Sequence, residues 1–166
     1  MDNKNKPVGK KFDYALFKAN DKLARDIGKK YWSSLNYKVY DNPDRYGPDL
    51  IVEEIGIDTY RHNIATDFYC EMEIKRAWKG KEFRYKTCQI PQRKGKYLDK
   101  TKYDKTCNFF IINNEYEYAF FIKEEDISSS PLVEVPNKYV PAGEFFYQVS
   151  LDKCKLIELG KHSNEK

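Results

Sequence analysis

Three charged residues, Glu71, Glu73 and Lys75, alternate with apolar residues in the segment 67–75 (Asp-Phe-Tyr-Cys-Glu-Met-Glu-Ile-Lys). Because side chains along a β-strand point to opposite faces in turn, we expect the charged residues to share one face with Tyr69. Two carboxylates and one ammonium group would then project together from a half-buried strand. Carboxylate oxygens bind Mg²⁺, and a neighbouring cation stabilises a charged transition state, so this pattern indicates phosphodiester hydrolysis.

The size and composition of the chain fit one globular domain. It has 166 residues, of which 40% are hydrophobic and 34% charged, so we expect a modest core under a charged surface. We predict a disordered basic tail at 1–12, a single domain at 13–160 and a second disordered tail at 161–166. No apolar run is long enough to span a bilayer and no signal-peptide pattern begins the chain, which predicts a cytoplasmic protein without a membrane partner.

The cysteines and histidines do not have the spacing of a zinc site. The four cysteines form no CxxC pair, and the chain contains two histidines. Cys70 falls among the apolar positions of its strand, where a free buried thiol is expected. A cytosolic setting also disfavours disulfides.

The segment from Lys75 to Lys105 concentrates the positive charge. It holds twelve Lys or Arg and three acidic residues, a net charge of +9, whereas the whole chain carries +4. A phosphate backbone is the natural partner for such a segment. The alternative is a solvated basic face, but the position directly after the acidic strand favours nucleic acid.

Hydrophobic periodicity and turn residues predict the order of the elements. The expected elements are a helix at 13–35, strands at 37–40, 49–55, 67–75 and 83–90, a short helix at 92–102, strands at 107–113 and 116–123, a long loop at 128–144 with a strand near 132–135, and strands at 145–150 and 155–159. We expect the last two strands to pair with each other as a C-terminal β-hairpin. The turn 56–66 would connect the second strand to the third.

This order, with Pro48-Asp49 opening one strand and Glu73-Ile74-Lys75 closing the next, resembles the PD-(D/E)XK nuclease superfamily. The superfamily includes restriction endonucleases, Holliday junction resolvases and phage nucleases, and the resemblance covers roughly residues 13–123. It implies an α/β fold, more broadly α+β. The core would be restriction-endonuclease-like, a central mixed β-sheet flanked by helices, with the C-terminal β-hairpin region added to it.

The resemblance also implies roles for individual residues. Asp49 and Glu73 would bind the metal, and the main-chain carbonyl of Ile74 would complete the coordination shell. Lys75 would be the catalytic lysine beside the attacking water and the scissile phosphate. Because neighbouring carboxylates raise the pKa of a lysine, an electrostatic role suits Lys75 better than a general-base role. The cofactor would be Mg²⁺, with Mn²⁺ able to substitute.

Several further assignments stay open between two interpretations. An acidic residue on the first helix would complete the site, and Asp26 is a better candidate than Asp21, although either could be a solvated helix charge. Glu71 could bind a second metal or pair with Lys75 or Arg76. The residues expected to contact nucleic acid are Arg84, Lys86, Gln89, Gln92, Arg93 and Lys94.

The resulting prediction is a metal-dependent DNA endonuclease, structure-specific or preferring single strands and encoded by a phage or a mobile element. Its setting would be a bacterial or phage-infected cell, and relatives that cut two strands make a homodimer plausible by analogy. One alternative is a sequence-specific restriction endonuclease. Others are a non-catalytic nucleic-acid-binding module on the same fold and a small α/β domain whose charged strand face is merely exposed.

Overall fold

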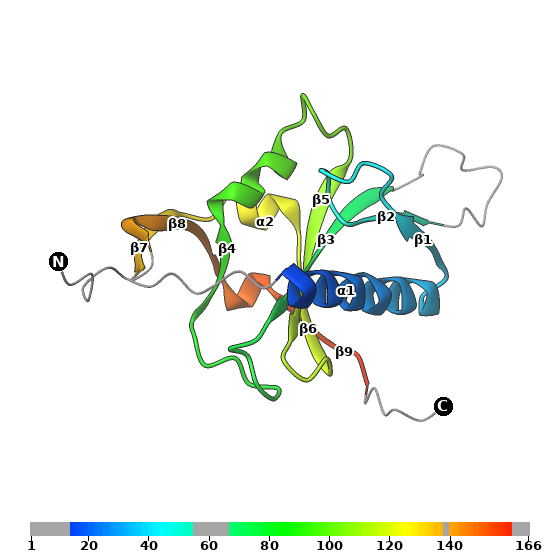
Figure 1. Cartoon of the computed structure of the whole chain (residues 1–166), viewed down its shortest axis with the longest axis horizontal. Helices are drawn as coiled ribbons and strands as arrows, with labels where there is room; N and C mark the ends of the chain where they lie inside the picture. Colours follow the sequence, from blue (N-terminus) through cyan, green and yellow to red (C-terminus); the bar gives the residue numbers. More distant parts are fainter. Residues whose placement is uncertain (1–13, 55–66, 138–139, 161–166) are drawn as a thin grey trace.

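The computed structural model describes residues 14–54, 67–137 and 140–160 (Figure 1). The predicted tails, 1–12 and 161–166, and the predicted turn 56–66 lie outside the described residues. Among the described helices, none combines the length and the apolar character needed to cross a membrane.

Six strands form a mixed central sheet in the order β1-β2-β3-β5-β6-β9. The strands are β1 (Tyr37–Asp41), β2 (Leu50–Glu54), β3 (Phe68–Lys75), β5 (Thr106–Asn113), β6 (Tyr118–Ile122) and β9 (Lys155–Glu158). Strands β3 and β5 run parallel, whereas the other neighbouring pairs run antiparallel. The expected mixed sheet in an α+β fold is therefore confirmed.

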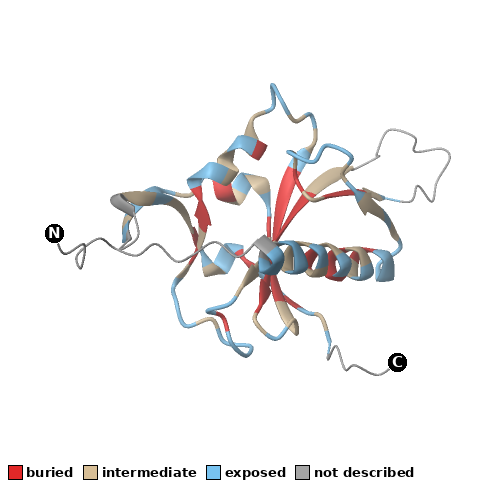
Figure 2. Cartoon of the chain, viewed as in Figure 1, coloured by how far each residue is buried: buried red, intermediate tan, exposed pale blue. Residues whose placement is uncertain are grey.

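Helix α1 (Tyr14–Ser34) covers one face of this sheet (Figure 1). Its buried residues Ala24, Ile27 and Trp32 pack into a core with apolar residues of the strands, and Figure 2 shows the exposed outer surface of the helix. Alternation along the sequence correctly predicted which residues of β3 face this core. They are Phe68, Cys70, Met72 and Ile74.

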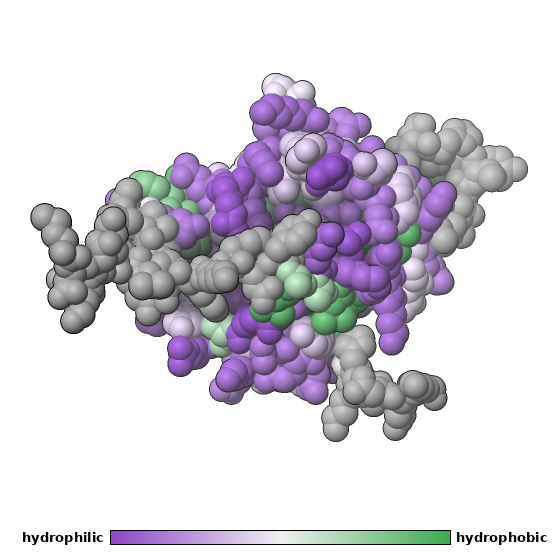
Figure 3. Space-filling model, in the orientation of Figure 1, coloured by the Kyte–Doolittle hydropathy of each residue, from purple (hydrophilic) through white to green (hydrophobic). Residues whose placement is uncertain are grey.

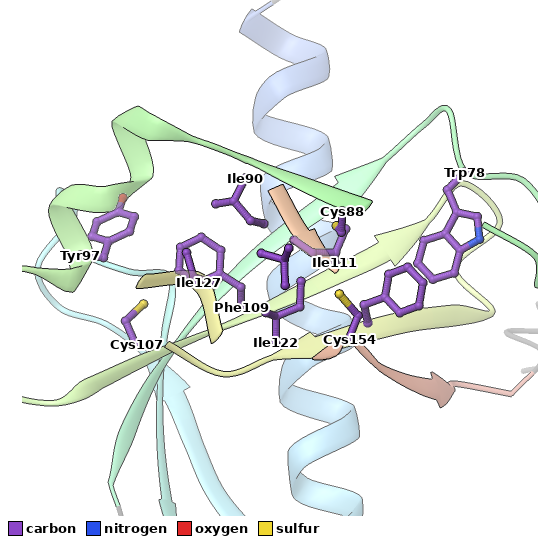
Figure 4. Close-up of a cluster of buried hydrophobic side chains, with 12 residues drawn as sticks. Trp78, Cys88, Ile90, Tyr97, Cys107, Phe109, Ile111, Ile122, Ile127 and Cys154 are labelled. Atoms are coloured by element: carbon purple, nitrogen blue, oxygen red, sulfur yellow. The ribbon is translucent and has the colours of Figure 1, made fainter. Parts of the chain in front are cut away.

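A second sheet, together with short helical segments, covers the other face. Its order is β4-β8-β7, with β4 (Thr87–Pro91), β8 (Val140–Ser150) and β7 (Leu132–Asn137), and the helical segments are η1 (Gln92–Leu98), α2 (Glu124–Ser128) and η2 (Leu151–Lys153). Figure 4 shows the core between these layers, where Ile90 of β4, Tyr97 of η1 and Phe109 of β5 belong to one cluster. The central sheet was expected to be flanked by helices. One face is covered by helix α1, but the other is covered mainly by the second sheet.

The expected C-terminal hairpin is wrong. Strand β8 pairs with β7 and β4, while β9 pairs with β6 at the edge of the main sheet. The turn η2 separates β8 from β9 and carries the chain from one sheet to the other. Strands 145–150 and 155–159 were correctly expected as strands, but their partners are set by distant segments.

Two other boundaries differ from the prediction for identifiable reasons. The strand predicted at 83–90 begins only at Thr87, because Phe83 packs against the rings of Trp78 and Phe120 instead of entering a ladder. The helix predicted at 92–102 is a 3₁₀ segment that ends at Leu98. Sequence alternation does not distinguish an aromatic loop from a strand.

Candidate functional site

A cleft of about 540 Å³ opens between the middle of α1, the loop 42–48, strand β3 and η1. Its walls include Asp21, Asp49, Glu71, Lys94 and Tyr97. Hydrophilic residues cover most of the molecular face drawn in Figure 3, which leaves the hydrophobic residues in small groups. Most residues of the cleft wall are charged or polar, so the cleft does not resemble an apolar ligand pocket.

The loop 42–48 is held by its own polar side chains, and it places Asp49 at the cleft. Asn42 donates from Nδ2 to the carbonyl of Pro48 at 2.9 Å, and its Oδ1 accepts from the backbone N–H of Asp44 at 3.1 Å. The backbone N–H of Tyr46 donates to Asp44 Oδ1 at 3.0 Å. Short polar side chains that bond their neighbouring backbone are typical of such turns.

Asp49 lies opposite Glu71 and not opposite Glu73. Leu50 pairs with Cys70 in the antiparallel ladder of β2 and β3, so the next pair outward brings Asp49 beside Glu71. The backbone N–H of Met72 donates to Asp49 Oδ2 at 2.8 Å. Glu73 is two residues farther along β3, about 6.6 Å at the usual rise of a strand.

Burial and mutual repulsion perturb the pair formed by Asp49 and Glu71. Glu71 is only 5% exposed. Burial, followed by a hydrogen bond to Glu71 and its charge, raises the pKa of Asp49 to about 8, although the N–H of Met72 and the charge of Lys94 act in the opposite direction. Two adjacent carboxylates that resist simultaneous ionisation are typical of acid–base or cation sites.

Lys94 brings a positive charge into this acidic group. Its ammonium nitrogen Nζ lies 3.6 Å from Glu71 Oε2 and 3.8 Å from Glu73 Oε2, and its side chain is 17% exposed. Burial lowers the pKa of Lys94, but the charges of Glu73, Glu71 and Asp49 outweigh burial and raise it above the ordinary value. Lys94 is therefore charged at the centre of the site.

Segment η1 fixes the position of Lys94 through close packing of two residues that follow it. Tyr97 is buried in the core under the second sheet, and its pKa is raised chiefly by burial and then by the charges of Glu71 and Asp49. A Cβ atom added at Gly95 would lie 2.6 Å from the hydroxyl oxygen of Tyr147, so glycine allows η1 to approach β8 closely. These two contacts hold the backbone that immediately follows Lys94.

Lys75, expected to be the catalytic lysine, lies at the far end of β3. Its Nζ donates to the main-chain carbonyl of Gln89 at 3.4 Å. Lys75 is four positions beyond Glu71, a separation of about 13 Å along an extended strand. The expected carbonyl ligand is displaced in the same way, because Asp49 lies beside the peptide of Met72 and not beside that of Ile74.

The first helix contributes Asp21 to the cleft and not Asp26, which corrects the preferred assignment. Asp26 pairs with Lys22 at 2.8 Å and with Lys29 at 3.7 Å on the outer surface, and the hydrogen bond from Lys22 lowers its pKa. Burial raises the pKa of Asp21, as do the charge of Asp49 and a hydrogen bond to it. The five-residue offset turns Asp26 away from the sheet.

Of the six residues expected to contact nucleic acid, Arg93 and Lys94 line the cleft. Arg93 forms a 3.8 Å ion pair with Glu144 and its side chain is 71% exposed. Arg84 stacks on Tyr85 in a separate hollow of about 550 Å³ next to Trp78. The other three expected residues, Lys86, Gln89 and Gln92, do not line the acidic cleft.

The donor atoms of the site suit a hard divalent cation. Within the described ranges, no three His, Cys, Asp or Glu side chains gather closely enough to form a metal cluster by themselves. Mg²⁺, however, usually keeps several waters and uses one or two carboxylates, which Asp49 and Glu71 supply. Glu73 Oε2 is buried without a hydrogen-bond partner, an orphaned oxygen that a cation would satisfy.

The comparisons with known proteins do not assign the chain to a family. No protein-family model matches it, and no match was found among curated proteins. The interpretation of the cleft consequently depends on its own geometry.

Proposed function

We propose that this protein is a metal-dependent nuclease that hydrolyses phosphodiester bonds, with DNA as its substrate. The observation that carries the proposal is the adjacency of Asp49 and Glu71 beside a buried lysine in an open polar cleft. Buried charges are costly, and a fold gains little stability from them. A divalent cation would relieve the repulsion between the two carboxylates.

The topology supports the same proposal. Helix α1, the antiparallel strands β1, β2 and β3, and the crossover to the parallel strand β5 follow the order expected for the PD-(D/E)XK nuclease superfamily. The carboxylates lie where β2 begins and along β3, as that resemblance implies. In this chain the crossover consists of β4 and η1 in place of one long helix.

The residues of the cleft divide the hydrolytic work. Asp49 and Glu71 would hold the cation, which lowers the pKa of water and stabilises negative charge on phosphorus. Glu73, which does not line the cleft itself but lies against Lys94 of its wall, has an Oε2 without a hydrogen bond and would accept the proton of the attacking water. As the water oxygen bonds to phosphorus, the bond to the leaving oxygen breaks, and that oxygen takes a proton from solvent.

The substrate proposal depends on charge and on access. The segment from Lys75 to Lys105 carries the net charge of +9, and Arg93 and Lys94 bring part of that charge to the cleft wall. We therefore favour DNA that is single-stranded or branched over a particular duplex sequence, in keeping with the single domain that the length of the chain predicts.

A non-catalytic nucleic-acid-binding module is the second candidate. The pairing of Lys94 with both Glu71 and Glu73 favours it, because this lysine neutralises the carboxylates without a metal. Such a module would bind DNA through the basic segment and would leave it intact.

Cleavage of labelled substrates distinguishes the two candidates. Single-stranded, duplex, flap and four-way-junction DNA and RNA would each be incubated with Mg²⁺, with Mn²⁺ and with EDTA. For a nuclease we expect metal-dependent cutting that Glu71→Gln reduces by about 100-fold or more. Asp26→Asn, on the outer surface of α1, is the matched control and should cut like wild type.

Three results would contradict the nuclease proposal. They are undiminished cutting in EDTA, full activity of Glu71→Gln, and tight binding of every substrate without cleavage under either metal. The last result would establish the binding module.

A further inference from the structure

Two lysines compete for the role of the cationic group at this site, and the structure separates them. The Nζ of Lys94 lies within 4 Å of carboxylate oxygens of both Glu71 and Glu73. The Nζ of Lys75 instead donates to the carbonyl of Gln89, on the strand of the second sheet. The motif in the sequence favours Lys75, whereas the distances favour Lys94.

We propose that Lys94 is the cationic partner of the acidic site: its ammonium group neutralises Glu71 and Glu73 in the metal-free protein and turns to the substrate phosphate when a divalent cation binds. This inference rests on the proposed function, because it concerns the same carboxylates. The cationic role that the sequence motif on β3 would give to Lys75 is thereby assigned to Lys94 on η1.

The distances indicate an ion pair that a metal can displace. Separations of 3.6 and 3.8 Å exceed the 2.7–2.9 Å of a charge-assisted hydrogen bond. The ammonium group therefore balances the negative charge of the two carboxylates without a short hydrogen bond to either oxygen. Glu73 Oε2 remains without a hydrogen-bond partner despite its proximity to Lys94. The carboxylates therefore retain capacity for another cation.

The charges of the site agree with a divalent ion. Asp49, Glu71 and Glu73 together carry three negative charges when ionised, and Lys94 carries one positive charge. The net charge of these four side chains is then two negative units, which a single Mg²⁺ or Mn²⁺ ion would neutralise.

The position of Lys94 on η1 suits a movement of the side chain alone. Gly95 holds the backbone close to Tyr147, and Tyr97 anchors the segment in the core. Lys94 thus has a fixed Cα at the cleft wall and a flexible chain of four methylene groups. Rotation of that chain would move the ammonium group from the carboxylates into the cleft, where a phosphate would lie.

The test compares Lys94→Met with Lys75→Met and uses Lys96→Met, on the same segment, as the control. Binding of Mn²⁺ alone would be followed by isothermal titration calorimetry, and thermal unfolding would be recorded in EDTA at pH 8. We expect Lys94→Met to lower the melting temperature of the metal-free protein and to bind Mn²⁺ at least about tenfold more tightly, because a competing cation is gone. Lys75→Met and Lys96→Met should bind Mn²⁺ like wild type.

Activity at saturating Mn²⁺ gives the second readout. Lys94→Met should then lose more cleavage than Lys75→Met, while Lys94→Arg should recover part of it by restoring the positive charge. If Lys94→Met does not fold, Lys94→Gln provides the same comparison.

The outcomes separate this inference from the proposed function. If wild type cuts none of the substrates, the nuclease proposal fails, yet the Mn²⁺ titration and the melting temperatures still decide whether Lys94 is the counter-ion. Unchanged Mn²⁺ affinity in Lys94→Met would overturn the inference, and so would a larger activity loss in Lys75→Met. An absence of Mn²⁺ binding in every variant would overturn it as well.

Discussion

Replacement of Asp49 by Asn should stabilise the metal-free protein at pH 8. The folded protein holds the pKa of Asp49 at about 8, whereas the ordinary value is 3.8, so the folded state binds the extra proton between these values. Stability must then fall as the pH rises through this window. Asn avoids this loss, because its carbonyl oxygen can accept from the N–H of Met72 and its amide can donate to Glu71.

The magnitude follows from the binding of one proton. One proton changes the free energy of unfolding by at most about 1.4 kcal/mol per pH unit. Because the raised pKa belongs to Asp49, we expect Asp49→Asn to be more stable than wild type by roughly 2–5 kcal/mol at pH 8, with little difference near pH 4.

Urea unfolding in EDTA at pH 5, 6, 7 and 8 measures this difference, with the buried Trp32 and Trp78 as fluorescent probes. Asp26→Asn is the control. The hydrogen bond from Lys22 lowers the pKa of Asp26, so this carboxylate is ionised from pH 5 to pH 8, and its replacement should destabilise the protein slightly and equally at each pH. A stability difference between Asp49→Asn and wild type that does not grow from pH 5 to pH 8 would refute the raised pKa of Asp49.

Three other predictions concern the packing of η1, the hydrogen bonds of Asn113 and the binding of Mg²⁺. Gly95→Ala should destabilise the protein by about 1–3 kcal/mol, as seen in chemical unfolding, and should weaken Mn²⁺ binding, because the added Cβ pushes η1 away from Tyr147. Asn113→Ala should cost about 2–4 kcal/mol in the same assay, since it leaves the carbonyl of Gly80 and the buried N–H of Glu117 without their partner. Mg²⁺ at 100 times its dissociation constant should stabilise wild type by about 2.7 kcal/mol in thermal unfolding and leave the stability of Asp49→Asn nearly unchanged. If Asp49 did not bind the metal, both proteins would be stabilised equally.

The local pattern of the chain was sufficient for most of the fold. Alternation placed the apolar side of β3 against α1, and the hairpin of β5 and β6 was predicted from two buried runs around a short polar turn. The pairing of β8 and β9 was not predictable in this way. Each of those strands finds its partner far away in the sequence, and alternation carries no information about which partner that is.

The sequence pointed to the residue types of the candidate site but not to their arrangement. Asp49, Glu71 and Glu73 are all within the segments that sequence reasoning selected, but their grouping depends on the register of β2 against β3. Those strands are joined by a long connection, so no short turn fixes the register from the sequence. The exchange of Asp26 for Asp21 has a similar cause, because an apolar stripe on a helix does not show which end of the helix meets the cleft.

The sequence by itself determined that acidic residues and a lysine share one face of a half-buried strand and that a strongly basic segment follows. This much is local, since a strand alternates its side chains whatever it pairs with. Only the tertiary structure decided that Asp49 meets Glu71, that Lys75 turns to the second sheet and that Lys94 enters the acidic group. These contacts join residues 14 or more positions apart along the chain, and packing between the two sheets and η1 sets them.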